Sequence, residues 1–92
     1  LSPPAFEPSC AMRGGYLKRR KTELDAIMEQ ARKGEWRPIQ EMANHVRGTG
    51  AMYGFPNIGL AAENLAKGLQ NGDPDCRTLV DLYAKAVAES YV

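Results

Sequence analysis

The sequence predicts an all-α fold, an antiparallel up-and-down four-helix bundle, and two observations lead to it. Four segments carry apolar residues at separations of three and four, which is the period of an amphipathic helix. Short breaks rich in Gly, Pro and Asn separate these segments, and short connections place successive helices antiparallel. No run of alternating apolar and polar residues predicts a strand.

The first helix is expected over about residues 16–33, and a glycine ends it. Its apolar stripe consists of Leu17, Leu24, Ile27 and Ala31. Gly34 follows and favours a left-handed cap. Residues 1–13 contain three prolines and no helical period, so we expect an N-terminal tail there and a bundle over residues 14–92.

The other three helices have equally clear apolar positions. The second begins near Trp36, with Pro38 in its first turn, and carries Ile39, Met42, Val46 and Tyr53. The third follows the break at residues 54–57, ends at Asn71-Gly72, and carries Ile58, Ala62, Leu65 and Leu69. The fourth begins at Asp73-Pro74 and has a buried face of Leu79, Leu82, Tyr83, Ala86 and Val87.

Composition narrows the classes of function. Twelve Lys and Arg against eleven Asp and Glu give a net charge of +1, which does not indicate a nucleic-acid-binding protein. The one basic run, residues 18–21, is read as a solvated helix face, with electrostatic docking as the alternative. No segment has the length of a membrane span, and Cys10 and Cys76 lack metal-ligand spacing. We therefore expect a cytoplasmic, monomeric protein with reduced thiols, no metal site and no cofactor.

Two glycines inside the second helix require an explanation, because each costs about 1 kcal/mol relative to alanine. Relative to Ile39 on a helical wheel, Gly50 falls at about 20°, beside the core, and close helix packing explains it. Gly48 falls at about 180° and faces away from the core. It is either a tolerated surface glycine or a place where a partner approaches closely.

An outward strip surrounds Gly48. Asn44, Arg47, Gly48 and Ala51 have the spacing i, i+3, i+4 and i+7, so they share one side of the helix. Its small residues leave the centre of the strip open, between one amide and one cation. That shape suits a partner that brings its own reactive group close to position 44.

His45 is the only histidine, and it falls on the flank of the same helix, about 100° from Asn44. Imidazole can act as a base or nucleophile near neutral pH. However, no Cys, Ser or carboxylate lies at a recognisable triad spacing. Geometry therefore favours a partly buried flank histidine, with a phosphoacceptor as the alternative.

The segment Ala43-Asn44-His45-Val46-Arg47-Gly48-Thr49, followed by Tyr53-Gly54-Phe55-Pro56, resembles the signature of the histidine-phosphotransfer (HPt) family. That signature reads roughly Ala-His-x-Leu-Lys-Gly-Ser/Thr, and the resemblance extends over about residues 16–91. Aligning the glycines places Arg47 on the basic position and Asn44 on the phosphoacceptor histidine. Aligning His45 with that histidine instead loses the basic and the core residue.

The resemblance implies exchange of a phosphoryl group with the aspartate of a response-regulator receiver domain, which supplies the Mg²⁺. Arg47 would steady the phosphoryl oxygens, Gly48 would leave room for the receiver, and Ala51, Gln40 and Glu41 would complete the docking surface. Asparagine has no nucleophilic nitrogen, so the chain is expected to dock without carrying phosphate, whether Asn44 is native or engineered. A hybrid sensor kinase is a further expected partner.

Two alternatives remain open from the sequence. The chain is an active phosphotransfer protein that uses His45, or it is an unrelated helical scaffold. Whether it only docks on receivers or transfers phosphate through His45, it is expected to be a docking or carrier module rather than a stand-alone enzyme.

Overall fold

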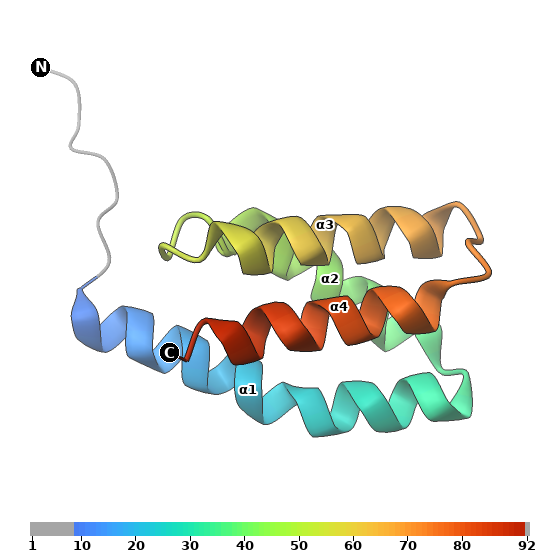
Figure 1. Ribbon diagram of the computed structural model, residues 1–92, viewed down its shortest axis with the longest axis horizontal. Coiled ribbons are helices and arrows are strands. Elements are labelled where there is room, and N and C mark those ends of the chain that lie inside the picture. Colours follow the sequence, from blue (N-terminus) through green and yellow to red (C-terminus); the bar gives the residue numbers. More distant parts are fainter. Residues whose placement is uncertain (1–8, 92) are drawn as a thin grey trace, which may run out of the picture.

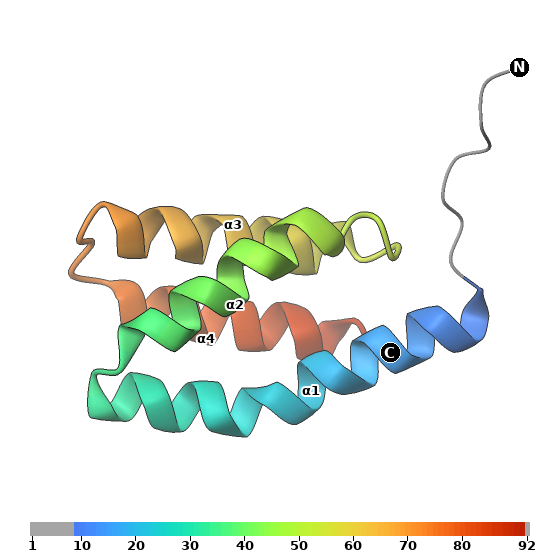
Figure 2. The ribbon, with the colours of Figure 1, turned by 180° about the vertical axis from the view of Figure 1, so that it is seen from behind.

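Four helices, packed one against the next, make up the fold in a computed structural model that describes residues 9–91. They are α1 (Cys10–Lys33), α2 (Trp36–Thr49), α3 (Pro56–Gln70) and α4 (Cys76–Glu89). Successive helices run in opposite directions, and α4 returns to lie beside α1 (Figures 1 and 2). The predicted all-α, four-helix architecture is confirmed, and residues 9–91 contain no strand.

The start of α1 differs from the sequence prediction. The helix begins at Cys10 instead of near Tyr16, because Ser9 caps it and accepts a hydrogen bond from the backbone N–H of Met12 at 3.1 Å. Gly14 and Gly15 disfavour a helix here, yet both lie inside α1. Residues 10–13 are therefore helical, and the rest of the predicted tail, residues 1–8, lies outside the described part of the chain.

The connection between α1 and α2 follows the prediction closely. Gly34 adopts φ 76°, a left-handed conformation that glycine reaches without steric cost. Its N–H donates to the carbonyl of Ala31 at 3.1 Å, and the N–H of Glu35 donates to Gln30 at 2.8 Å. α2 then begins at Trp36, with Pro38 in its first turn.

Two other helix boundaries were predicted wrongly. α2 ends at Thr49, so Tyr53 lies in the following turn, half-buried, and not on the helix. α4 begins at Cys76 and not at Asp73-Pro74. The Asp73 carboxylate accepts the backbone N–H of Asp75 at 2.8 Å, so it stabilises a turn before the helix.

The core is built from the predicted helix stripes. Its largest fully buried side chains are Tyr83, Ile39, Ile58, Leu65, Val46, Val80 and Val87. Leu82, predicted to be buried, is 52% exposed because it lies about 100° around α4 from its neighbour Tyr83. The stripe of Val80, Tyr83 and Val87 faces the core instead.

One basic residue belongs to the interior. Arg20 is only 3% exposed, whereas the rest of the basic run, Lys18, Arg19 and Lys21, is exposed. The prediction of a solvated face is therefore wrong for Arg20. Its position explains the burial, since it follows Leu17 by three residues and precedes Leu24 by four, on the apolar stripe of α1.

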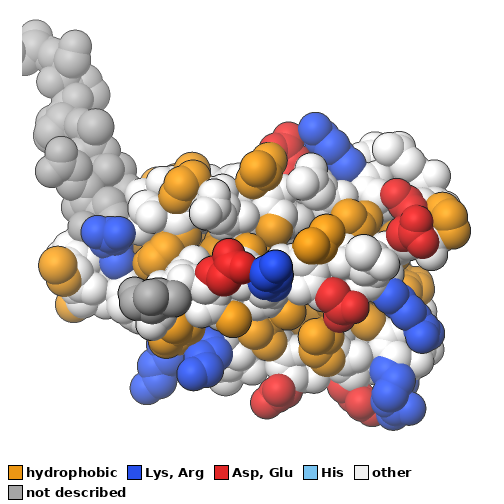
Figure 3. All heavy atoms as spheres, in the orientation of Figure 1, with side chains coloured by type: hydrophobic (Ala, Val, Ile, Leu, Met, Phe, Trp, Pro, Cys, Tyr) orange, Lys and Arg blue, Asp and Glu red, His pale blue; other side chains and the backbone are white. Residues whose placement is uncertain are grey.

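The surface carries charges of both signs. On the face that Figure 3 shows, acidic and basic side chains lie interspersed with apolar ones. Among the described helices, none is both long and apolar enough to cross a membrane.

Candidate functional site

The predicted outward strip is exposed, but only Asn44, Arg47 and Gly48 lie on α2, because the helix ends at Thr49 and Ala51 lies in the turn that follows. Asn44, Arg47, Gly48 and Ala51 are all exposed, and a Cβ atom added at Gly48 would meet nothing within 4 Å. Figure 2 shows α2 in front of the other helices, with no helix over its outer side. No ion pair within residues 9–91 engages the Arg47 guanidinium. The strip therefore offers an amide and a cation on either side of an open centre.

Gly50 lies on the opposite side of this helix end. A Cβ atom there would come within 2.6 Å of the backbone nitrogen of Gly59 and 2.7 Å of its Cα. The backbones of α2 and α3 thus touch at two glycines, and the prediction of close packing at Gly50 is confirmed. Close helix packing explains the glycine at position 50. No contact inside the bundle explains the glycine at position 48.

Aromatic contacts hold the turn that follows the strip. The rings of Tyr16 and Tyr53 stack at 4.5 Å between centroids, with an interplanar angle of 7°. The Nε–H of Arg13 donates to the carbonyl of Tyr53 at 3.2 Å, and its guanidinium lies 5.6 Å from the centre of the Phe55 ring. The first turns of α1 thereby fix the end of α2. Arg13 is not among the predicted site residues, because the sequence predicts a tail over residues 1–13.

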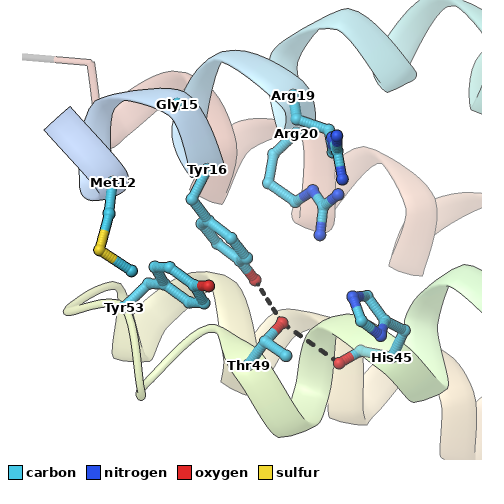
Figure 4. Close-up of a pocket in the computed structure, with 8 residues that line it drawn as sticks. All are labelled: Met12, Gly15, Tyr16, Arg19, Arg20, His45, Thr49 and Tyr53. Carbon is cyan, nitrogen blue, oxygen red and sulfur yellow. Dashed lines mark hydrogen bonds between the residues drawn. The ribbon is translucent and has the colours of Figure 1, made fainter. Parts of the chain in front are cut away.

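His45 lies on the flank of α2 that faces α1, as the wheel predicts. Its side chain is exposed, so the expectation of partial burial is wrong. It borders a hollow of about 390 Å³ between α1 and α2 (Figure 4). Neither a carboxylate nor a thiol lines this hollow among the described residues, so His45 has no partner of a catalytic triad there.

A hydroxyl chain crosses the same hollow. The hydroxyls of Tyr16 and Thr49 are 2.8 Å apart, and Thr49 Oγ1 donates to the carbonyl of His45 at 3.2 Å (Figure 4). With Thr49 as the donor to that carbonyl, Tyr16 donates to Thr49. Both hydroxyl hydrogens are then used in hydrogen bonds, and these two bonds join α1 to the turn of α2 that carries His45.

Gln40 and Glu41, the remaining predicted docking residues, lie one turn before Asn44. Glu41 is exposed, and its carboxylate lies 3.6 Å from Arg37 Nε. Gln40 is half-buried and borders a second hollow with Trp36 and Arg77. Glu41 is therefore open to a partner, whereas Gln40 lies partly against the connection between α3 and α4.

The cysteines and acidic residues form no metal site within residues 9–91. Cys10 is exposed and Cys76 is buried, and neither forms a disulfide. Burial raises the pKa of the Cys76 thiol, and the charges of Asp73 and Asp75 raise it further. Its Sγ–H donates to the carbonyl of Asp73 at 2.9 Å, so this thiol has a structural role at the start of α4.

No family model, curated protein or solved structure matches this chain.

Proposed function

We propose that the chain is an HPt-type module that docks on response-regulator receiver domains in the cytoplasm and does not itself carry the phosphoryl group. The outward strip at the end of α2 and in the turn after it is the observation that carries this proposal. It consists of Asn44, Arg47, Gly48 and Ala51, all exposed, with open space above Gly48. The up-and-down order of the helices is the arrangement that the HPt resemblance implies.

The shape of the strip supports docking rather than a ligand pocket. A receiver must bring its phosphorylated aspartate close to position 44, and phosphoryl transfer depends mainly on such positioning. Gly48, one turn after Asn44, provides the room for that approach. Arg47 provides a positive charge that attracts the phosphoryl oxygens of the receiver.

The side chain of Asn44 determines which chemistry is available at position 44. Its amide nitrogen is delocalised into the carbonyl group, so it does not attack phosphorus. The side chain still donates and accepts hydrogen bonds at an interface. The module would therefore occupy a receiver, competing with active carriers or kinases, without accepting its phosphate.

The alternative acceptor, His45, is exposed and hence accessible. It faces the hollow beside α1, not the open space above Gly48. A receiver centred on Gly48 would meet Asn44 first. Labelled phosphate on the wild-type chain that disappears in His45→Ala would establish this alternative in place of docking alone.

The docking proposal is tested with a pair of glycine variants. Gly48→Gln places a side chain in the open centre of the strip, and Gly14→Gln is its control, because a Cβ atom at Gly14 also meets nothing within 4 Å. Both variants gain helix propensity, so neither is expected to lose stability.

Binding to a panel of purified receiver domains, with and without beryllofluoride, is measured by calorimetry. We expect wild type and Gly14→Gln to bind the same receiver equally, and Gly48→Gln to bind at least about tenfold more weakly, as expected for a clash that displaces well-packed contacts. Equal binding by all three would contradict docking through this strip.

A further inference from the structure

The hollow between α1 and α2 is lined by basic side chains that docking through Gly48 does not use. Tyr16, Arg19 and Arg20 line it from α1, and His45 and Thr49 line it from α2 (Figure 4). No acidic side chain lines it among the described residues. A concave site with several basic groups and no acidic one favours anions.

The two arginines contribute in different ways. Arg20 is 3% exposed, and its charge is balanced by Glu23, whose Oε1 lies 2.9 Å from its Nε. Arg19 is exposed, and no ion pair involves it within residues 9–91. One positive charge beside the hollow is therefore left unbalanced.

Arg20 also has a hydrogen-bond donor without an acceptor. Its Nη2 donates to Glu23 Oε2 at 3.3 Å, but its buried Nη1 has no acceptor in the described part of the chain. Nε approaches Glu23 closely without the alignment of a hydrogen bond. Buried donors are nearly always satisfied, by protein, water or a bound group. Figure 4 shows this guanidinium pointing from α1 into the space between Tyr16 and His45.

We propose that this hollow binds a small organic oxyanion, a phosphate or carboxylate group, through Arg19, Arg20 and His45. Arg19 and His45 reach the anion from its open side. Nη1 of Arg20 is buried, so it reaches an oxygen of the anion only once a neighbouring side chain rotates. Guanidinium groups suit phosphate and carboxylate because their planar donors match two oxygens at once.

The other end of the hollow selects the body of the ligand. Met12 and the stacked ring of Tyr53 line it there, and they present apolar surface. The volume of about 390 Å³ exceeds what an inorganic ion needs. A ligand with an aromatic or apolar body next to its oxyanion therefore fits better than the ion alone.

The test is a titration of the ¹⁵N-labelled chain followed by NMR at constant ionic strength. The probes are phenyl phosphate, benzoate, inorganic phosphate and uncharged phenol. We expect saturable shifts at the residues lining the hollow, tighter binding of phenyl phosphate or benzoate than of inorganic phosphate, and the weakest binding for phenol. The stronger of the two aromatic anions identifies the oxyanion class. Phenol binding as tightly as the anions, or no saturable shift with any probe, would overturn the proposal.

Two variants separate a built site from general attraction to basic helices. Arg19→Gln removes a charge that borders the hollow, and Lys18→Gln removes the neighbouring charge, which does not border it. We expect about tenfold weaker binding in Arg19→Gln, the loss of one hydrogen bond to a charged group, and unchanged binding in Lys18→Gln. Equal losses in Arg19→Gln and Lys18→Gln would refute a specific site. Both residues are exposed, so neither substitution is expected to unfold the chain.

Discussion

Gly50 at the end of α2 and Gly59 in α3 pack backbone against backbone, so that a Cβ atom on Gly50 would lie 2.6 Å from the nitrogen of Gly59. Two residues earlier, Gly48 has only open space beside it. The α2–α3 contact thus accounts for one helical glycine, and the exposed strip for the other. This difference predicts opposite effects for the same substitution.

Gly50→Ala should destabilise the protein by about 1 to 3 kcal/mol, because α2 and α3 must move apart to admit the methyl group. Gly48→Ala should stabilise it by about 0.5 to 1 kcal/mol through helix propensity. Urea denaturation followed by circular dichroism measures both. Equal effects of the two substitutions would show that the backbones do not meet at Gly50.

Removal of the carboxylate beside Arg20 should leave a buried cation without its counter-charge. We expect Glu23→Gln to lower the free energy of unfolding by about 1 to 3 kcal/mol, a value below that of fully buried pairs because Glu23 is 35% exposed. Glu29→Gln, which breaks an exposed pair with Arg32, is the control and should leave the unfolding midpoint unchanged. Equal midpoints for the two variants would contradict a buried role for Arg20.

Tyr83 predicts a loss of stability at alkaline pH. Burial raises its pKa well above the ordinary value of 10.0, and the nearby charge of Arg20 opposes this rise. Above pH 10 the unfolded chain loses the phenolic proton while the folded chain keeps it. The contribution of Tyr83 is therefore fully present below that pH and is lost as the pH rises toward the folded-state pKa.

Tyr83→Phe tests this directly. Since the Tyr83 hydroxyl is buried without a hydrogen-bond partner within residues 9–91, the variant should be as stable as wild type at neutral pH, or more stable by about 1 kcal/mol. Its stability should also fall less steeply above pH 10, as measured by urea denaturation across that range. A variant that is much less stable at neutral pH would show that the hydroxyl has an essential partner.

The two thiols should differ in reactivity. Cys10 is exposed, whereas Cys76 is buried with a raised pKa and donates to a carbonyl. In the native protein, Ellman's reagent should modify Cys10 rapidly and Cys76 only as fast as the bundle opens, because the thiolate is the reactive form. Cys10→Ser should abolish the fast phase. A fast phase that survives in this variant would contradict the burial of Cys76.

The apolar stripes could be predicted from the sequence, because a helix that buries one face repeats its apolar residues with the period of the helix. Ile39, Val46 and Tyr83 are fully buried as their spacing indicates. The left-handed cap at Gly34 could also be predicted, since a glycine after a helical stripe has few other uses. Boundaries that depend on tertiary contacts could not be predicted. α1 extends through Gly14 and Gly15 to Arg13, whose partners Tyr53 and Phe55 lie beyond α2.

The outward strip could likewise be predicted, because solvent exposure of Asn44 and Gly48 follows from the helical period. The hollow beside His45 could not, since it depends on how α1 meets α2. One signal was present nonetheless. Arg20 occupies an apolar stripe position between Leu17 and Leu24, and a cation on such a stripe indicates a buried, partnered charge.

The proposed function makes position 44 a phosphoacceptor position whose nucleophile is absent. Asn44→His restores an imidazole whose Nε2 can attack phosphorus, forming a P–N bond as the P–O bond to the receiver aspartate breaks and its carboxylate leaves. Incubation with Mg²⁺ and receiver domains carrying labelled phosphate measures the transfer. We predict acid-labile, alkali-stable label on Asn44→His, none on wild type, and much less when Gly48→Gln is added. An Asn44→His chain that gains no label from any receiver and binds none would contradict the account.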